Sequence, residues 1–466
     1  MEAPSSPVSD SEIPGATQLH EAAWRGSIRE LERLVRKEGM DVNLTTKPDG
    51  WTSLHVAVDA YLFHQDETLV ESLIHLKADP SRGNRKNTTP LMIAALQPES
   101  NSLEVLIRAG ADLNARNENG RTAMHKAVHK NNVSAVTQLC NAGADLNIPD
   151  KRGNTSLMLA ARHERADTLQ VLIRSGAWLN AQDHNRDTAV HMAIYNNNVY
   201  ALEQLCKAGA DVEIPGHNGC LPTYVAVFRG YLDILKVLEK FGADLNQPCT
   251  NNCTLLIVAV ELMQHNVLDY LARHYPGLLD MKTDDDGCTA LHVAVKDENE
   301  EAVHKLCEAR ANVNAQDTKG YTPLMFAVSQ ENFSIVFILH HYDADPTITS
   351  SEGTALEIAK RNNCHDIFQC IHTLELLWCK PGDASRTMKA LSDEMMCSIC
   401  LEVIRDPATA HPCQHSFCAG CLQNAMKENK TCPNCRADVQ QLVTNHMLAN
   451  VARAFGGAPP AKRARW

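Results

Sequence analysis

The strongest constraint on the fold of this chain is a phrase of sequence that returns every 33 residues. Thr122, Thr155 and Thr188 open successive copies of this phrase. A second phrase, Gly-Ala-Asp-Leu-Asn or a close variant, follows at a fixed offset, as at 110–114 and 143–147. Internal repeats with a period of about 20 to 50 residues indicate a stack of similar structural units, each too small to fold alone.

Each copy has the pattern of two short helices. Leu291, Ala294 and Val295 fall on one helical face because they are spaced i, i+3 and i+4, and the same spacing returns at 303–307. Helices of this length are marginal in water because nucleation is costly, so neighbouring units must bury each other's apolar faces in a solenoid. The Gly of the second phrase ends the second helix with a left-handed turn that a Cβ would penalise.

Period and phrases together resemble the ankyrin repeat over residues 13–372, which corresponds to about eleven units. The resemblance implies a mainly α fold, an ankyrin-repeat solenoid, preceded by a disordered N-terminus at 1–12. Two stretches depart from the pattern: 60–68 lengthens one unit, and 273–287 carries an insertion with a proline. We interpret them as bends, as loops used in binding, or as surface insertions that the fold tolerates.

Recurrent histidines and cysteines in the array are interpreted as structural. One repeat position is occupied by histidines, which predicts a packing or turn role: His20, His55, His125, His191 and His292. Two further positions are occupied by cysteines, which predicts small apolar side chains: Cys140, Cys206, Cys307 and Cys220, Cys253, Cys288. The cysteines at 249 and 253 have loose metal-ligand spacing, but Cys253 belongs to the repeat.

The array shows no converging acids, bases or nucleophiles, and a solenoid of this kind indicates protein binding on a concave face. A formal net charge of −12 argues against nucleic-acid binding, which needs basic residues to neutralise phosphates. No apolar run approaches the roughly 18 residues that span a bilayer, and residues 1–12 lack the apolar stretch of a secretory leader. We therefore expect a cytoplasmic protein with reduced cysteines, with the nucleus also open.

A second feature follows a predicted linker at 373–394. It consists of closely spaced metal-ligand side chains, in the order Cys397, Cys400, Cys413, His415, Cys418, Cys421, Cys432 and Cys435. Eight such donors make two tetrahedral zinc sites of four. A segment of about forty residues cannot bury a sufficient core, so two structural zinc ions would hold it together.

The order of three cysteines, one histidine and four cysteines resembles the RING finger, over residues 395–440. The resemblance implies a cross-brace, although the sequence alone permits other pairings. One zinc would be held by Cys397, Cys400, Cys418 and Cys421, and the other by Cys413, His415, Cys432 and Cys435. His411 is interpreted as a surface residue. Fully coordinated zinc has no open position for substrate, so both sites would be structural.

The RING resemblance implies a ubiquitin-protein ligase. Such a domain binds a ubiquitin-conjugating enzyme and orients its ubiquitin thioester for direct attack by a substrate lysine, with no covalent intermediate on the ligase. The contact residues that match the family are Ile399, Leu422, Pro433 and Arg436, of which the arginine bridges conjugating enzyme and ubiquitin. Ala425 stands where many RING domains have tryptophan, which lowers the expected affinity for the conjugating enzyme. The repeats would recruit a protein substrate on their concave face.

The remaining segments are a predicted C-terminal helix at 441–456, which packs on the RING or pairs two RINGs, and a flexible basic tail at 457–466. Two alternatives to the ligase remain. A non-enzymatic scaffold would use its RING only for dimerisation or docking, and an ankyrin-type regulator of transcription would act in the nucleus. The match at Ile399, Pro433 and Arg436 favours the ligase, because a dimerising RING needs no bridging arginine.

Overall fold

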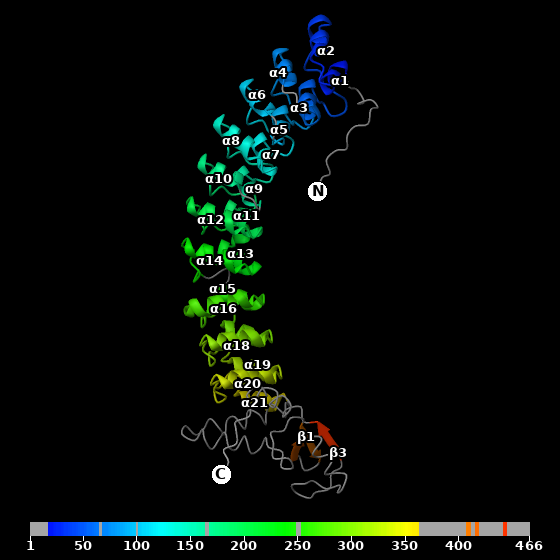
Figure 1. The fold of residues 1–466 in the computed structure, drawn as a ribbon. Helices are drawn as coiled ribbons and strands as arrows, with labels where there is room; N and C mark the ends of the chain where they lie inside the picture. The colour runs from blue at the N-terminus through cyan, green and yellow to red at the C-terminus, as the bar shows by residue number, and fades with distance from the viewer. Residues whose placement is uncertain are drawn as a thin grey trace, which may run out of the picture. The chain divides into compact units, whose positions relative to one another are not determined.

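The computed structural model describes residues 17–64, 68–98, 101–163, 167–247, 253–362, 407–411, 415–418 and 441–444. It divides into two compact units, Met1–Leu245 and Asn246–Trp466, which are described separately. Helices dominate both units (Figure 1), and short strands occur only at the C-terminal end of the described residues.

The first unit is a stack of helix pairs, each with a first and a second helix (Figure 1). The first helices are α1 Gln18–Trp24, α3 Ser53–His64, α5 Pro90–Ala94, α7 Ala123–His129, α9 Ser156–Ala161, α11 Ala189–Tyr195 and α13 Pro222–Arg229. The second helices are α2 Ile28–Glu32, which continues into a π-helical turn at Arg33–Lys37, α4 Thr68–His75, α6 Ser102–Arg108, α8 Val133–Asn141, α10 Asp167–Arg174, α12 Val199–Lys207 and α14 Leu232–Lys240. A 3₁₀ turn at His217–Gly219 precedes α13.

The second unit repeats the same pairing. Its helices are α15 Leu255–Glu261 with α16 His265–His274, α17 Ala290–Lys296 with α18 Glu300–Glu308, α19 Pro323–Ser329 with α20 Phe333–His341, and α21 Ala355–Arg361. A 3₁₀ turn at Pro276–Leu278 follows α16. The strands are β1 Pro407–His411, β2 His415–Cys418 and β3 Gln441–Thr444.

The core of the array is built from the same positions in successive units. Leu106, Leu139, Leu172, Leu205 and Leu238 lie 33 residues apart on successive second helices, and each is fully buried. Each leucine lies against its counterparts because consecutive second helices pack together. Burying a side chain of this size contributes on the order of 2 kcal/mol, which one isolated unit could not gain. The predicted stacking of short helices is confirmed.

The recurrent histidines link one unit to the next. In α7, the backbone N–H of Thr122 donates to Nδ1 of His125 at 3.2 Å, and the Thr122 hydroxyl lies 2.9 Å from the same nitrogen. Because Nδ1 accepts a hydrogen bond, the ring proton resides on Nε2, which donates to the carbonyl of Asn154 at 3.1 Å. His125 thus caps its own helix and binds the finger turn of the following unit. Its predicted structural role is confirmed.

The same bridge recurs along both units. Nε2 of His55 contacts the carbonyl of Thr88 at 2.9 Å, and Nε2 of His292 contacts the carbonyl of Tyr321 at 3.0 Å. Both rings are fully buried. Burial lowers the pKa of His55 to about 4, and it lowers the pKa of His125 and His292 below the ordinary value. The neutral tautomer that the bridge requires is therefore the stable form.

The second helices end in the left-handed turn that the glycine phrase predicts. Gly110 and Gly143 have φ of 78° and 84°. Lys77, Arg310 and Asp343 occupy the equivalent position in other units and have φ between 65° and 69°. The turn is therefore a property of the repeat, and glycine is the residue that adopts it without a steric penalty.

The cysteines of the array behave as the repeat predicts. Cys206 and Cys307 are buried on the inner side of their second helices, and Cys288 is 1% exposed. Burial raises the pKa of Cys206 to about 11 and that of Cys307 to about 12. These thiols are therefore protonated at neutral pH and act as small apolar groups.

The two departures from the repeat have different structures. The stretch at 60–68 lengthens the first helix of its unit, because α3 continues to His64. The stretch at 273–287 includes the 3₁₀ turn, and Leu278 and Leu279 in and after this turn are buried. Part of the second insertion therefore belongs to the core and is not a plain surface loop.

We predict that the array loses stability as the pH falls from 7 to 4. The pKa of His55 is lower in the folded than in the unfolded chain, so the folded state binds fewer protons and its advantage is complete only above the ordinary pKa of 6.5. His55 alone should lower the free energy of unfolding by on the order of 2–3 kcal/mol at pH 4, as measured by urea denaturation at a series of pH values.

The matched variants are His55→Gln and His184→Gln. Glutamine can accept the helix-capping hydrogen bond and donate to the next unit, but it does not titrate, so His55→Gln should flatten the pH dependence. His184 is exposed in a finger turn, and its substitution should leave the dependence unchanged. Equal pH slopes for the unmodified chain and His55→Gln would contradict the bridge as the source.

Candidate functional site

The strands of the second unit form a small antiparallel sheet in the order β2-β1-β3. In its register Ala410 of β1 pairs with His415 of β2, and Pro407 pairs with Cys418. On the other side of β1, Thr409 pairs with Val443 of β3. Two predicted zinc ligands therefore stand at the two ends of one strand.

Most predicted residues of the RING lie outside the described residues. These are the ligands Cys397, Cys400, Cys413, Cys421, Cys432 and Cys435, and the contact residues Ile399, Leu422, Pro433 and Arg436. Of the predicted ligands only His415 and Cys418 fall in a described strand, and His411 closes β1. The donor set nevertheless suits zinc, since thiolate and imidazole are the usual ligands of tetrahedral structural zinc.

The predicted helix at 441–456 is wrong at its start, where residues 441–444 form β3. The sheet therefore extends past residue 440, the predicted end of the RING. The apolar spacing of this segment fits a helix, but Val443 and Thr444 are β-branched and pair with β1, which outweighs a weak local preference. The rest of the predicted helix lies outside the described residues.

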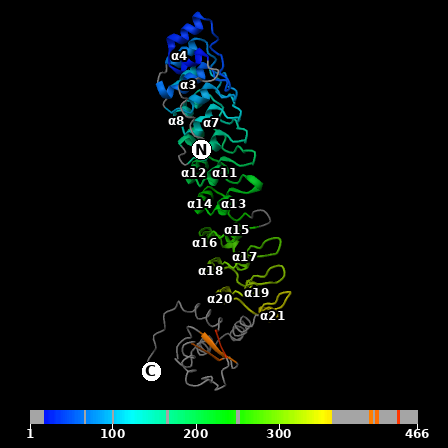
Figure 2. The same cartoon turned by 90° about the vertical axis from the view of Figure 1, so that its right-hand side faces the viewer.

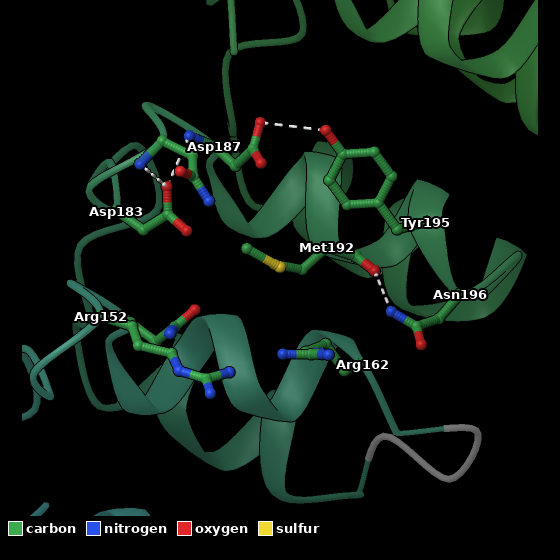
Figure 3. Close-up of a pocket in the computed structure, with 9 residues that line it drawn as sticks. Arg152, Arg162, Asp183, Asp187, Met192, Tyr195 and Asn196 are labelled. Atoms are coloured by element: carbon green, nitrogen blue, oxygen red, sulfur yellow. Dashed lines mark hydrogen bonds between the residues drawn. The ribbon is translucent and has the colours of Figure 1, made fainter. Parts of the chain in front are cut away.

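A second candidate site lies in the first unit, on the surface formed by its first helices and finger turns, which we call the first-helix face. The unit bends toward this face in Figure 1, and the finger turns form a row along one edge in Figure 2. Here a pocket of about 220 Å³ opens between α9 and α11 (Figure 3). Its lining includes Arg152, Arg162, Asp183, Asp187, Met192 and Tyr195.

The two carboxylates of the pocket are engaged by the fold. Asp183 is 8% exposed, and its Oδ1 accepts the backbone N–H groups of Asn185 and Asp187, which closes the finger turn. Asp187 is 4% exposed, and its Oδ1 accepts from the Tyr195 hydroxyl at 3.2 Å and from the N–H of His217 at 3.0 Å. Burial and the nearby carboxylate raise the pKa of Tyr195, so its hydroxyl remains a donor.

The two guanidinium groups of the pocket are exposed and point toward each other across its lower side (Figure 3). Among the described residues neither Arg152 nor Arg162 forms a side-chain hydrogen bond or ion pair that would neutralise it. The neighbouring α7 adds Lys126 and Lys130 to this part of the surface. The pocket is thus positively charged at its opening, although the whole chain is acidic.

Two neighbouring histidines report the same charge. His129 and His163 lie on the first-helix face with ring centroids 6.4 Å apart. Burial lowers the pKa of both, and nearby cations lower it further, Arg121 for His129 and Arg162 for His163. Both rings are therefore held toward the neutral form by a positive environment.

This pocket was not predicted from the sequence. Arg162, Tyr195 and Phe228 occupy one exposed repeat position, 33 residues apart. An alignment of the exposed positions at that period would have shown a change from basic to aromatic residues along the array. The repeat phrases alone conceal it, because they record the buried positions.

The described part of the chain contains no group of three or more His, Cys, Asp or Glu side chains that could hold a metal ion. It also contains no helix that is long and apolar enough to cross a bilayer.

Comparison with known families assigns both parts of the chain. A family model for ankyrin repeats in three copies matches residues 19–117, 60–150, 91–183, 157–249 and 224–317, and a many-copy ankyrin model matches 306–359. A model of the C3HC4-type RING zinc finger matches residues 396–435. The fold and the donor set together define a helical-repeat protein that carries a zinc finger.

The chain belongs to the ankyrin-repeat family and carries a C3HC4-type RING finger. The predicted fold class, a mainly α ankyrin solenoid followed by a small RING domain, is thereby confirmed. A RING finger binds zinc, which is consistent with the predicted cofactor.

Individual relatives resemble parts of the chain. E3 ubiquitin-protein ligase CHFR of Xenopus tropicalis is 30% identical over 121 residues, which is 25% of this chain and 19% of the relative. E3 ubiquitin-protein ligase RNF180 of Mus musculus is 35% identical over 66 residues, 14% of this chain and 11% of the relative. The chain thus spans less than a fifth of either relative. The solved ankyrin repeat domain of Bcl-3 aligns with a TM-score of 0.44 and 28% identity, over 48% of this chain and 99% of that domain.

Proposed function

We propose that this protein is a RING-type ubiquitin-protein ligase whose ankyrin repeats recruit a protein substrate. The observation that carries the proposal is the RING match at 396–435, together with partial similarity to two proteins named as E3 ubiquitin-protein ligases. The repeats supply a binding surface, and among the described residues they hold no arrangement that suggests chemistry of their own.

Two structural zinc ions would shape the RING. The proposed cross-brace places Cys397, Cys400, Cys418 and Cys421 on one ion and Cys413, His415, Cys432 and Cys435 on the other. Successive positions of a strand alternate between its faces, so positions 415 and 418 fall on opposite faces of β2, which supports their assignment to different ions. Zinc would supply folding energy and no open coordination site.

The transfer reaction would depend on orientation. Ile399, Leu422 and Pro433 would contact the ubiquitin-conjugating enzyme, and Arg436 would bridge that enzyme and its ubiquitin. The planar guanidinium can donate to two carbonyl groups at once, which a lysine cannot imitate. Holding the thioester in one reactive arrangement lowers the entropic part of the barrier, and the substrate lysine then attacks it directly.

The second candidate function is the non-enzymatic scaffold, in which the RING only docks or pairs two chains. The RING match alone is compatible with it, but the matching bridging residue Arg436 favours the ligase. We place the array at 13–372, the linker at 373–394 and the RING from 395 through β3, in a cytoplasmic protein with the nucleus also open.

The first prediction from this proposal concerns zinc. The full-length chain should contain two zinc ions after dialysis, and Cys397→Ser should lower that number. A chelator should abolish conjugating-enzyme binding while most of the helical circular-dichroism signal persists, because repeat arrays are held by neighbour contacts that need no metal. Loss of most helicity on chelation would contradict separate stabilisation of the two parts.

The second prediction separates orientation from docking. In the full-length chain, Arg436→Ala should leave zinc content and conjugating-enzyme binding nearly unchanged but slow ubiquitin discharge to free lysine by about 10²-fold. Ile399→Ala should weaken conjugating-enzyme binding by about tenfold, because it removes buried apolar contact.

Arg405→Ala is the matched control, since it removes an arginine of the same segment that does not adjoin a predicted zinc ligand. It should discharge ubiquitin at the unmodified rate. The ligase proposal fails if the unmodified chain promotes no discharge with any member of a broad panel of conjugating enzymes. An Arg436→Ala chain that is folded and fully active would reject the bridging role alone.

A further inference from the structure

The exposed residues of the first-helix face change character along the first unit. Arg162, Tyr195 and Phe228 stand at the same position of α9, α11 and α13, and these helices pack against one another in that order. The basic end includes Arg152 of the adjacent finger turn. The aromatic end includes Tyr224, whose ring stacks on that of Phe228 with centroids 6.1 Å apart.

Phe228 is 48% exposed, which is unusual for a large apolar side chain in an otherwise polar surface. It lies close to the pocket because neighbouring helices are spaced by about 10 Å, so Arg162 and Phe228 are separated by about 20 Å. An extended peptide covers that distance with about six residues. One short segment could therefore contact both ends.

We propose that this surface binds an extended peptide segment of a partner protein, with a carboxylate side chain held between Arg152 and Arg162 and an apolar side chain resting on Tyr224 and Phe228. The inference rests on the proposed function, for which it specifies the chemistry of the recruited substrate. It concerns residues that no part of the ubiquitin reaction uses.

Charge complementarity selects the carboxylate. The two guanidinium groups offer planar pairs of N–H donors that match a carboxylate, and the donors of the pocket's other side are already used by the fold. The buried Asp183 and Asp187 partly offset the positive charge, so a singly charged carboxylate is favoured over a doubly charged phosphate. Nucleic acid fits less well, because the basic residues are confined to this stretch of an acidic chain.

The experiment measures peptide binding to the full-length chain by fluorescence anisotropy, without ubiquitin or its enzymes. The probe is a fluorescein-labelled peptide with a central Asp-Glu-Asp, flanked on both sides by a Gly-Ser spacer and then Leu-Phe, so that either chain direction can be accommodated. Analogues carry Asn-Gln-Asn or phosphoserine in the centre, and a single-stranded RNA of equal charge tests the other macromolecule.

The expected result is binding of the acidic peptide that weakens at least about tenfold in the Asn-Gln-Asn analogue and in Arg162→Glu. Arg174→Glu makes the same charge change on the exposed surface of α10 and should have little effect. Phe228→Ala should weaken binding about fivefold through lost apolar contact. Tyr200→Ala, whose ring is 45% exposed on the second helix α12, is its control.

Several results would overturn the inference. They are absence of peptide binding, equal losses in Arg162→Glu and Arg174→Glu, tighter binding of the phosphoserine analogue, or tighter binding of the RNA. Circular dichroism of each variant establishes that it is folded. Failure here leaves the ubiquitin-discharge result intact, and failure of discharge leaves the peptide result intact, so the two proposals are tested separately.

Discussion

The array depends on a neutral imidazole that serves two units at once. In His125 the Nδ1 atom accepts from the backbone of its own helix start, which leaves the proton on Nε2 to bind the carbonyl of Asn154 in the following turn. A protonated ring could not accept the first bond, so burial, tautomer and repeat stacking are one property. Because the bridge spans 29 residues, it fixes the register between consecutive units. The leucines on the second helices can then meet their counterparts.

This construction separates residues that make the fold from residues that are free to specialise. Asp183 and Asp187 lie in the pocket, yet their oxygens are committed to a finger turn and to Tyr195. Arg152 and Arg162 stand beside them on the same face, and their side chains have no fold-determining contact among the described residues. A repeat protein can therefore change its binding surface at exposed positions without disturbing the bridges below them.

The extent of prediction from sequence follows from how local each signal is. The helix pairs, the histidine role and the left-handed turn were predictable because each is set by a few neighbouring residues and returns many times. The strand at 441–444 was not, because its pairing with β1 joins residues more than thirty positions apart, and the apolar spacing of that segment also suited a helix. The pocket was missed for a related reason. It forms only when the finger turn holding Arg152 is placed beside α9 and α11.

The proposed division of labour is consistent with these energetics. A RING with fully coordinated zinc has no site for substrate chemistry, so selectivity must come from elsewhere in the chain. Exposed arginines accelerate encounter with an acidic segment more than they prolong its residence, because surface charges are screened and well hydrated. Rapid exchange suits a ligase, since a modified substrate must leave before another is recruited. A deep apolar groove would bind more tightly but would release the product more slowly.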